Sequence, residues 1–132
     1  MPQEEDSCRF SQNERLKSSL SIKNVVDGRQ SVSSFPVKCF YSWVDESTNP
    51  TQLAVVVPKR RFKHAVDRNR GKRLLREAFR LNKSLIPACE GKSLQMCWIY
   101  TGSELASFEE ITTSVQRIYM KMNAKLHPQD SL

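Results

Sequence analysis

The sequence predicts a single domain of the α/β (α+β) class, in which a small mixed sheet is packed by helices. The chain has 132 residues, close to the commonest single-domain size, and 39% of them are hydrophobic, which is enough for one buried core. Apolar residues recur with a helical period in three segments and with a strand pattern in three others. The predicted order is helix, strand, strand, helix, strand, helix, without an internal repeat.

The first half of the chain predicts one helix and two strands. The helix is expected to follow Arg15 and to end at Gly28, because apolar residues recur there at near-helical intervals and glycine commonly ends helices. Residues 35–44 alternate and are rich in aromatic and β-branched side chains, which predicts a strand. Turn-forming residues fill 45–50. The continuous apolar run at 52–58 predicts a second, central strand.

The second half predicts a long helix over 65–86, which a proline follows, and a buried strand over 93–100. A final helix is expected to begin after Ser107. Glu110, three residues further on, completes a capping box with this serine, and the helix is predicted to run to Pro128.

The ends of the chain differ from its middle. Residues 1–13 are polar and aperiodic and are predicted to form a flexible arm, residues 14–126 the folded domain, and residues 127–132 a disordered tail. No apolar run approaches the roughly 20 residues that span a bilayer, and the N-terminus lacks the layout of a signal peptide. The cysteines show neither zinc-site spacing nor a disulfide framework. We therefore expect a cytoplasmic protein.

The charge is concentrated in one block. Residues 59–83 contain eleven Lys or Arg against Asp67 and Glu77, an excess of nine, whereas the whole chain carries a net charge of +7. The remaining residues are therefore net −2. A basic block on a weakly acidic body predicts a polyanionic partner that meets one surface of the protein.

On a helical wheel the block separates into two faces. The apolar arc, predicted to face the core, contains Gly71, Leu74, Leu75, Ala78, Phe79, Leu81, Leu85 and Ile86. The other arc, here called the basic face, contains Asn69, Arg70, Lys72, Arg73, Arg76, Arg80 and Lys83. A merely solvated face would intersperse acids at i,i+4, and this one has only Glu77. The pattern therefore favours a face that follows phosphates, and the excess of arginine favours forked contacts to them.

Two further features extend this prediction. Lys59, Arg60 and Arg61 lie just before the helix and enlarge the same basic footprint. In the strand at 35–44, alternation places Lys38 and Phe40 on the face opposite Val37, Cys39, Tyr41 and Trp43. A lysine beside an aromatic ring suits single-stranded nucleic acid, which needs a counter-charge and a stacking surface. The alternative is an ordinary amphipathic strand with Phe40 in the core.

No set of residues in the sequence predicts catalysis by the protein itself. Hydrolysis would need clustered carboxylates for metals, or a nucleophile beside a positioned histidine, and neither pattern is present. The alternatives considered were a structural, ribosomal-type RNA-binding protein, a DNA-binding helix module and a stand-alone nuclease. A DNA recognition helix usually follows a partner helix, whereas a strand precedes this one.

The stretch PKRRFKHAVDRNRGKRLLREAFR, residues 58–80, resembles the signature of the bacterial ribonuclease P protein subunit. That signature has an Arg-Asn-Arg core followed by Lys-Arg, then Arg-Glu, then an aromatic residue and Arg. The matching residues are Arg68, Asn69, Arg70, Lys72, Arg73, Arg76, Glu77, Phe79 and Arg80. So long a motif is specific, and the resemblance extends over residues 15–126.

The resemblance implies a fold, a partner and a reaction. The fold is a single α/β domain similar to a ribosomal-protein domain, with a left-handed βαβ crossover that carries the arginine-rich helix; general rules would favour the right-handed form. The partner is the catalytic RNA of ribonuclease P, an endoribonuclease that removes the 5′ leader of precursor tRNA with Mg²⁺ held by the RNA. The protein is then an auxiliary subunit that supplies no catalytic residue and no metal ligand, and its partners include neither DNA nor a membrane.

The resemblance also implies site residues. The RNA-binding residues are Arg68, Asn69, Arg70, Lys72, Arg73 and Arg76, and a cleft between the first helix and the sheet holds the leader. Ile22, Val26 and Phe40 stand where family members commonly have aromatic residues of this cleft, with Lys38 beside them. Only Phe40 is aromatic here, so Ile22 and Val26 would make van der Waals contacts instead. Lys63 stands where many members have a glycine.

Overall fold

The computed structural model describes residues 15–16, 19–28, 30–45 and 51–126. Its elements are α2 (Ser19–Asp27), β1 (Ser31–Ser34), β2 (Val37–Val44), β3 (Gln52–Val56), α3 (Ala65–Leu81), the short 3₁₀ helix η2 (Lys83–Leu85), β4 (Ser93–Tyr100) and α4 (Phe108–Leu126). Within these residues a four-stranded mixed sheet is packed by three α-helices, which confirms the predicted class. The predicted arm and tail, and positions 46–50 of the predicted turn, lie outside the described residues.

The strands follow one another in the order β1-β2-β4-β3. β1 pairs with β2 and β2 with β4 in antiparallel fashion, whereas β3 and β4 are parallel and α3 connects them. The handedness of this βαβ connection stays a prediction from the family resemblance. The prediction of a central second strand is wrong, because β3 is the last of the four strands. Its apolar run has another cause: Leu53 is buried on one face of the sheet and Ala54 on the other.

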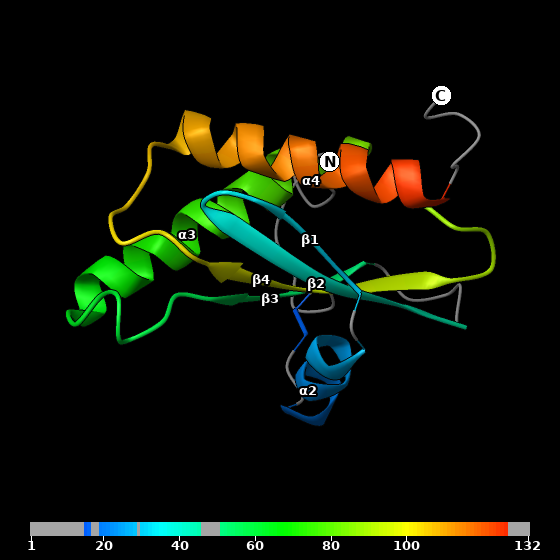
Figure 1. Ribbon diagram of the computed structural model, residues 1–132, viewed down its shortest axis with the longest axis horizontal. Coiled ribbons are helices and arrows are strands. Elements are labelled where there is room, and N and C mark those ends of the chain that lie inside the picture. Colours follow the sequence, from blue (N-terminus) through cyan, green and yellow to red (C-terminus); the bar gives the residue numbers. More distant parts are fainter. Residues whose placement is uncertain (1–14, 17–18, 29, 46–50, 127–132) are drawn as a thin grey trace, which may run out of the picture.

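The two faces of the sheet are covered by different helices (Figure 1). α3 and α4 lie on one face, over the main core, and α2 lies on the opposite face. The buried residues of the smaller, α2-side cluster are Leu16, Val25, Ala54 and Cys97. The two surfaces that the sequence singled out, the basic face of α3 and the region of α2 and β2, therefore lie on opposite sides of the sheet.

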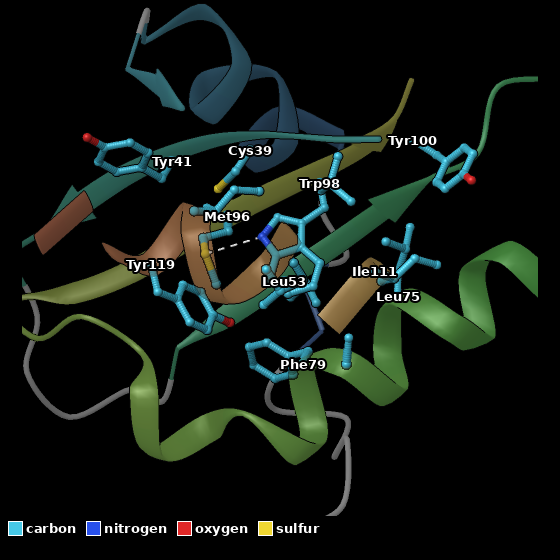
Figure 2. Close-up of a cluster of buried hydrophobic side chains, with 14 of the residues drawn as sticks. Cys39, Tyr41, Leu53, Leu75, Phe79, Met96, Trp98, Tyr100, Ile111 and Tyr119 are labelled. Carbon is cyan, nitrogen blue, oxygen red and sulfur yellow. Dashed lines mark hydrogen bonds between the residues drawn. The ribbon is translucent and has the colours of Figure 1, made fainter. Parts of the chain in front are cut away.

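Trp98 on β4 anchors α3 and α4 to the sheet (Figure 2). Its ring meets Phe79 of α3 edge-on at 6.0 Å between centroids and Tyr119 of α4 at 6.2 Å. The indole Nε1–H donates a hydrogen bond to the sulfur of Met96, 3.4 Å away. All four side chains are at most 1% exposed. Such aromatic pairs contribute about 0.5–1.5 kcal/mol each beyond their buried area, so the arginine-rich helix is held on a rigid base.

The start of the first helix differs from the prediction. Arg15 and Leu16 are not helical: Arg15 forms a parallel β-bridge with Leu53, and the Leu16 N–H donates to the Leu53 carbonyl at 3.0 Å. Leu16 is buried beneath α2 by this pairing. Leu16 therefore belongs to the hydrophobic cluster beneath α2, although it is not a residue of that helix.

The end of α3 also differs. The helix ends at Leu81, five residues earlier than predicted. The side-chain amide of Asn82 donates to the Ala78 carbonyl at 2.7 Å, the Asn82 backbone N–H donates to the Phe79 carbonyl, and residues 83–85 form the 3₁₀ helix η2. Leu81 and Leu85 are consequently 53% and 48% exposed, so placing them in the core was wrong.

One strand of the sheet was not predicted, and the last helix begins as predicted. β1 was not predicted, since its sequence SVSS is short and has one large apolar residue, Val32, which is buried against the main core. The capping box of α4 is confirmed: the Glu110 N–H donates to Ser107 Oγ at 3.2 Å, and the Ser107 N–H donates to the Glu110 carboxylate at 3.4 Å.

Candidate nucleic-acid interface

The core side of α3 lies unusually close to the end of β3. Gly71, Leu75, Ala78 and Phe79 are its buried residues. A Cβ atom added at Gly71 would lie 3.1 Å from Cγ2 of Val57, tighter than ordinary van der Waals contact. The absence of a side chain at Gly71 thus lets the first turns of the helix approach the end of β3 closely.

The loop that precedes α3 is fixed by one of the predicted RNA-binding residues. Nη1 of Arg68 donates to the carbonyl oxygens of Phe62 and Lys63, both at 2.9 Å. The Phe62 ring packs on Tyr100 at 5.7 Å between centroids. Arg68 therefore holds the loop through one end of its guanidinium group. The predicted basic residues of that loop are exposed: Lys59, Arg60 and Arg61.

The basic face is a continuous surface of α3. Asn69, Arg70 and Arg73 are exposed, and Lys72, Arg76 and Arg80 are half-buried. Arg80 forms an ion pair with Glu77, and its hydrogen bond and charge lower the pKa of the Glu77 carboxyl. Arg70, Lys72, Arg73 and Arg76 make no side-chain hydrogen bond or ion pair with another described residue. Four cations on a rigid helix are thus available to a partner.

The residues predicted to line a leader cleft come together on the opposite side of the sheet. Ile22 and Val26 of α2 and Phe40 of β2 are half-buried and pack around the α2-side cluster, together with Ile99 of β4. Nζ of Lys38 lies 4.9 Å from the centroid of the Phe40 ring. This set of five residues, Ile22, Val26, Lys38, Phe40 and Ile99, is here called the α2–β2 surface.

The alternation predicted for β2 is confirmed. Val37, Cys39 and Tyr41 are buried in the main core, and Trp43 packs against it. Phe40 lies on the other face of the sheet, where its ring is half-buried against the α2-side cluster. Its role in leader binding, as opposed to packing alone, stays a prediction.

Sequence patterns did not indicate that the charge of Arg15 would act on a residue of the basic face. Arg15 acts electrostatically on Arg76, and burial together with this like charge lowers the pKa of the Arg76 guanidinium. The sequence placed Arg15 just before the first predicted helix, and nothing in it indicated that its charge would act on Arg76 of α3.

Two negative findings concern the described part of the chain. No three His, Cys, Asp or Glu side chains there are placed to hold a metal ion. Among the helices resolved between residues 19 and 126, none combines the length and apolarity of a membrane span.

Three of the cysteines lie within the described residues and have free thiols: Cys39, Cys89 and Cys97. Burial raises the pKa of the Cys97 thiol to about 11. Burial also raises the pKa of the Cys39 thiol, above that of Cys97. Cys39 and Cys97 are thus neutral packing residues at pH 7.

Comparisons with known proteins agree with the signature of α3. The family described as Ribonuclease P matches residues 10–123. The ribonuclease P protein component of Porphyromonas gingivalis is 29% identical over 117 residues, which cover 86% of this chain and 85% of that protein. The protein of the same name from Pseudoalteromonas translucida is 36% identical over 77 residues, 58% of this chain and 52% of that protein.

Solved structures share the fold. The RNase P protein of Thermotoga maritima has a TM-score of 0.67 at 22% identity, covering 82% of this chain and 96% of that one. The Staphylococcus aureus RNase P protein has a TM-score of 0.66 at 20% identity, covering 83% and 94%. Since the family match spans most of the chain and includes the whole arginine-rich helix, this chain belongs to the ribonuclease P protein family.

Proposed function

We propose that this chain is the protein partner of a catalytic ribonuclease P RNA and that the basic face of α3 binds that RNA. The observation that carries the proposal is the set of four cations, Arg70, Lys72, Arg73 and Arg76, that share one helical face without side-chain partners among the described residues. A guanidinium group pairs with phosphate oxygens in a forked geometry, and helical spacing presents such groups in a row. The exposed residues Lys59, Arg60 and Arg61 extend the same surface towards the end of β3.

The fold supports binding with little reorganisation. α3 is anchored on Trp98 through Phe79, and Arg68 holds the loop that leads into the helix. A cation on a rigid element loses less freedom on binding than one on a mobile loop, which favours affinity. Electrostatic binding of this kind depends on salt, because each neutralised phosphate releases counterions.

In this proposal the α2–β2 surface contacts the 5′ leader of precursor tRNA. Phe40 offers a ring for base stacking and Lys38 offers a charge for the backbone, as single-stranded nucleic acid requires. Ile22 and Val26 supply aliphatic contacts beside them. Because this surface and the basic face lie on opposite sides of the sheet, leader binding and RNA binding use separate residues.

In this proposal the RNA carries out the cleavage reaction, and the protein contributes binding. Mg²⁺ would be held by the RNA and would supply there the activation of water for removal of the leader. The protein raises affinity for the precursor relative to the mature product, since only the precursor has a leader for the α2–β2 surface. The protein works in the cytoplasm with its RNA, and no residue of the chain takes part in bond cleavage.

Cleavage of precursor tRNA by a bacterial ribonuclease P RNA at low Mg²⁺ tests the proposal. We expect little cleavage by the RNA alone, a strong increase on addition of the protein, and none by RNA-free protein. Arg73→Ala should reduce the stimulation, whereas Arg117→Ala, which removes an exposed arginine of α4, should leave it unchanged. Cleavage by RNA-free protein, or absence of stimulation by the wild-type chain, would contradict the proposal.

A further inference from the structure

A row of polar side chains crosses the sheet beside the α2–β2 surface. Ser42 of β2 lies opposite Gln95 of β4, and Gln95 lies opposite Gln52 of β3. Gln95 is on the α2 side of the sheet, because Cys97 of the α2-side cluster is two residues away along the same strand. Directly opposed residues share a face, so all three side chains lie on this side. Each is half-buried and keeps part of its surface open.

The side-chain amide of Gln95 is held at one end and free at the other. Its Nε2–H donates to Oε1 of Gln52 at 3.0 Å. The Gln95 side chain makes no other hydrogen bond or ion pair with a described residue. The carbonyl oxygen Oε1 and the second Nε2–H of Gln95 are therefore available, an acceptor beside a donor. Because Gln52 fixes the amide, this pair of groups is already oriented before a ligand binds.

Gln95 lies close to the proposed stacking surface of Phe40. Phe40 is opposite Cys97, so Gln95 is its diagonal neighbour on the same face. Diagonal neighbours in an antiparallel pair are about 7–8 Å apart, which long side chains can span. Lys38 lies on the other side of Phe40 along β2. A strand that places a phosphate at Lys38 and a base on Phe40 therefore brings the next base to the Gln95 amide.

We propose that Gln95 hydrogen-bonds to the edge of the leader base next to the one stacked on Phe40, and that it favours adenine over guanine there. This inference rests on the proposed function, since the leader is the strand on the α2–β2 surface. Adenine presents an N6–H donor beside the N7 acceptor, which match the free Oε1 and Nε2–H of Gln95. The same edge of guanine presents two acceptors, N7 and O6, so Oε1 would face an acceptor. Bases in single-stranded RNA leave these edges accessible.

Binding of precursor tRNAs that differ in a single leader nucleotide tests the proposal. The assembled ribonucleoprotein is titrated with precursors that carry adenine or guanine at each leader position in turn. With the wild-type chain we expect about tenfold tighter binding of adenine than of guanine at one position. Gln95→Leu removes the amide at similar volume and should bring this ratio to about one. Phe40→Ala should instead weaken the binding of every leader sequence.

A second variant tests the orientation of the amide. Gln52→Leu leaves Gln95 in place and removes the acceptor that fixes it, so the ratio should fall below the wild-type value. Gln116→Leu on α4 is the matched control, because Gln116 is an exposed glutamine outside this face, and its ratio should equal that of the wild type. The ratio compares two substrates of the same protein, so a loss of folded protein does not change it.

The outcomes separate this inference from the function on which it rests. A wild-type ratio in Gln95→Leu would overturn the base contact, and so would equal binding of adenine and guanine by the wild-type chain at every position. In either case, tighter binding of precursor than of mature tRNA would leave the proposed function intact. A wild-type ratio in Gln52→Leu would overturn its role as a positioning residue. Failure of the wild-type chain to distinguish precursor from mature tRNA would instead contradict the proposed leader contact.

Discussion

Nζ of Lys38 lies 4.9 Å from the centroid of the Phe40 ring, on the face of β2 that α2 covers in part. Both side chains are half-buried, so each retains a surface for contact with a ligand. Their arrangement places a positive charge and an aromatic face within the span of one nucleotide. If a leader binds the α2–β2 surface, the two residues can meet a phosphate and a base of the same strand.

Phe40→Ala should weaken binding of precursor tRNA but not of mature tRNA. Removing a stacking surface is expected to cost about 1–3 kcal/mol per base, and only the precursor has bases at this position. Equilibrium binding of both tRNAs to the assembled ribonucleoprotein measures the difference. Phe35→Ala is the matched control, since Phe35 is 78% exposed and lies outside the α2–β2 surface. Equal losses for precursor and mature tRNA would rule out the leader contact.

Arg70→Ala and Arg73→Ala should each weaken binding of the catalytic RNA and lower the salt slope by about one unit per lost phosphate contact. Both side chains are exposed on α3 and make no polar side-chain contact with another described residue, so the folded protein should keep its stability. Filter binding over a range of salt concentrations measures the slope. An equal loss in Arg117→Ala would show that net charge alone, and not the basic face, determines affinity.

Asn82→Ala should destabilise the fold by about 1–3 kcal/mol, because it leaves the buried Ala78 carbonyl without its side-chain donor. The Asn82 amide donates to the Ala78 carbonyl at 2.7 Å, and its oxygen accepts from Nε2 of Gln116 on α4 at 3.2 Å. Urea unfolding measures the loss. Gln116→Ala removes only the second contact from an exposed position and should cost less. If the two variants lose the same stability, the contact with α4 carries the whole effect.

Lys121→Ala combined with Lys125→Ala should increase self-association. The two ammonium groups on α4 donate to the Ser33 and Ser31 carbonyls of the edge strand β1, which point away from β2. Capped carbonyls and nearby charges hinder pairing with the edge of another sheet. Sedimentation velocity at increasing concentration measures the association. Lys92→Ala, which removes an exposed cation paired with Asp45, should remain at the wild-type association state.

The sequence alone predicts those features that depend on neighbours along the chain. The basic face of α3 follows from helical periodicity, and the capping box of Ser107 and Glu110 follows from a three-residue spacing. Alternation along β2 correctly separates Cys39 from Phe40. In each case the interacting groups lie within four residues or on one regular element, so local geometry is sufficient.

Tertiary structure decided the features that depend on distant partners. Leu16 has helical spacing, yet its N–H donates to the Leu53 carbonyl, so residues 15 and 16 are extended and pair with β3. β1 forms because β2 supplies its backbone hydrogen bonds, although its own four residues have little apolar content. A backbone N–H or C=O group forms its hydrogen bond with whichever partner the tertiary packing places next to it. For a short segment this hydrogen bonding outweighs the weak secondary-structure propensity of its residues.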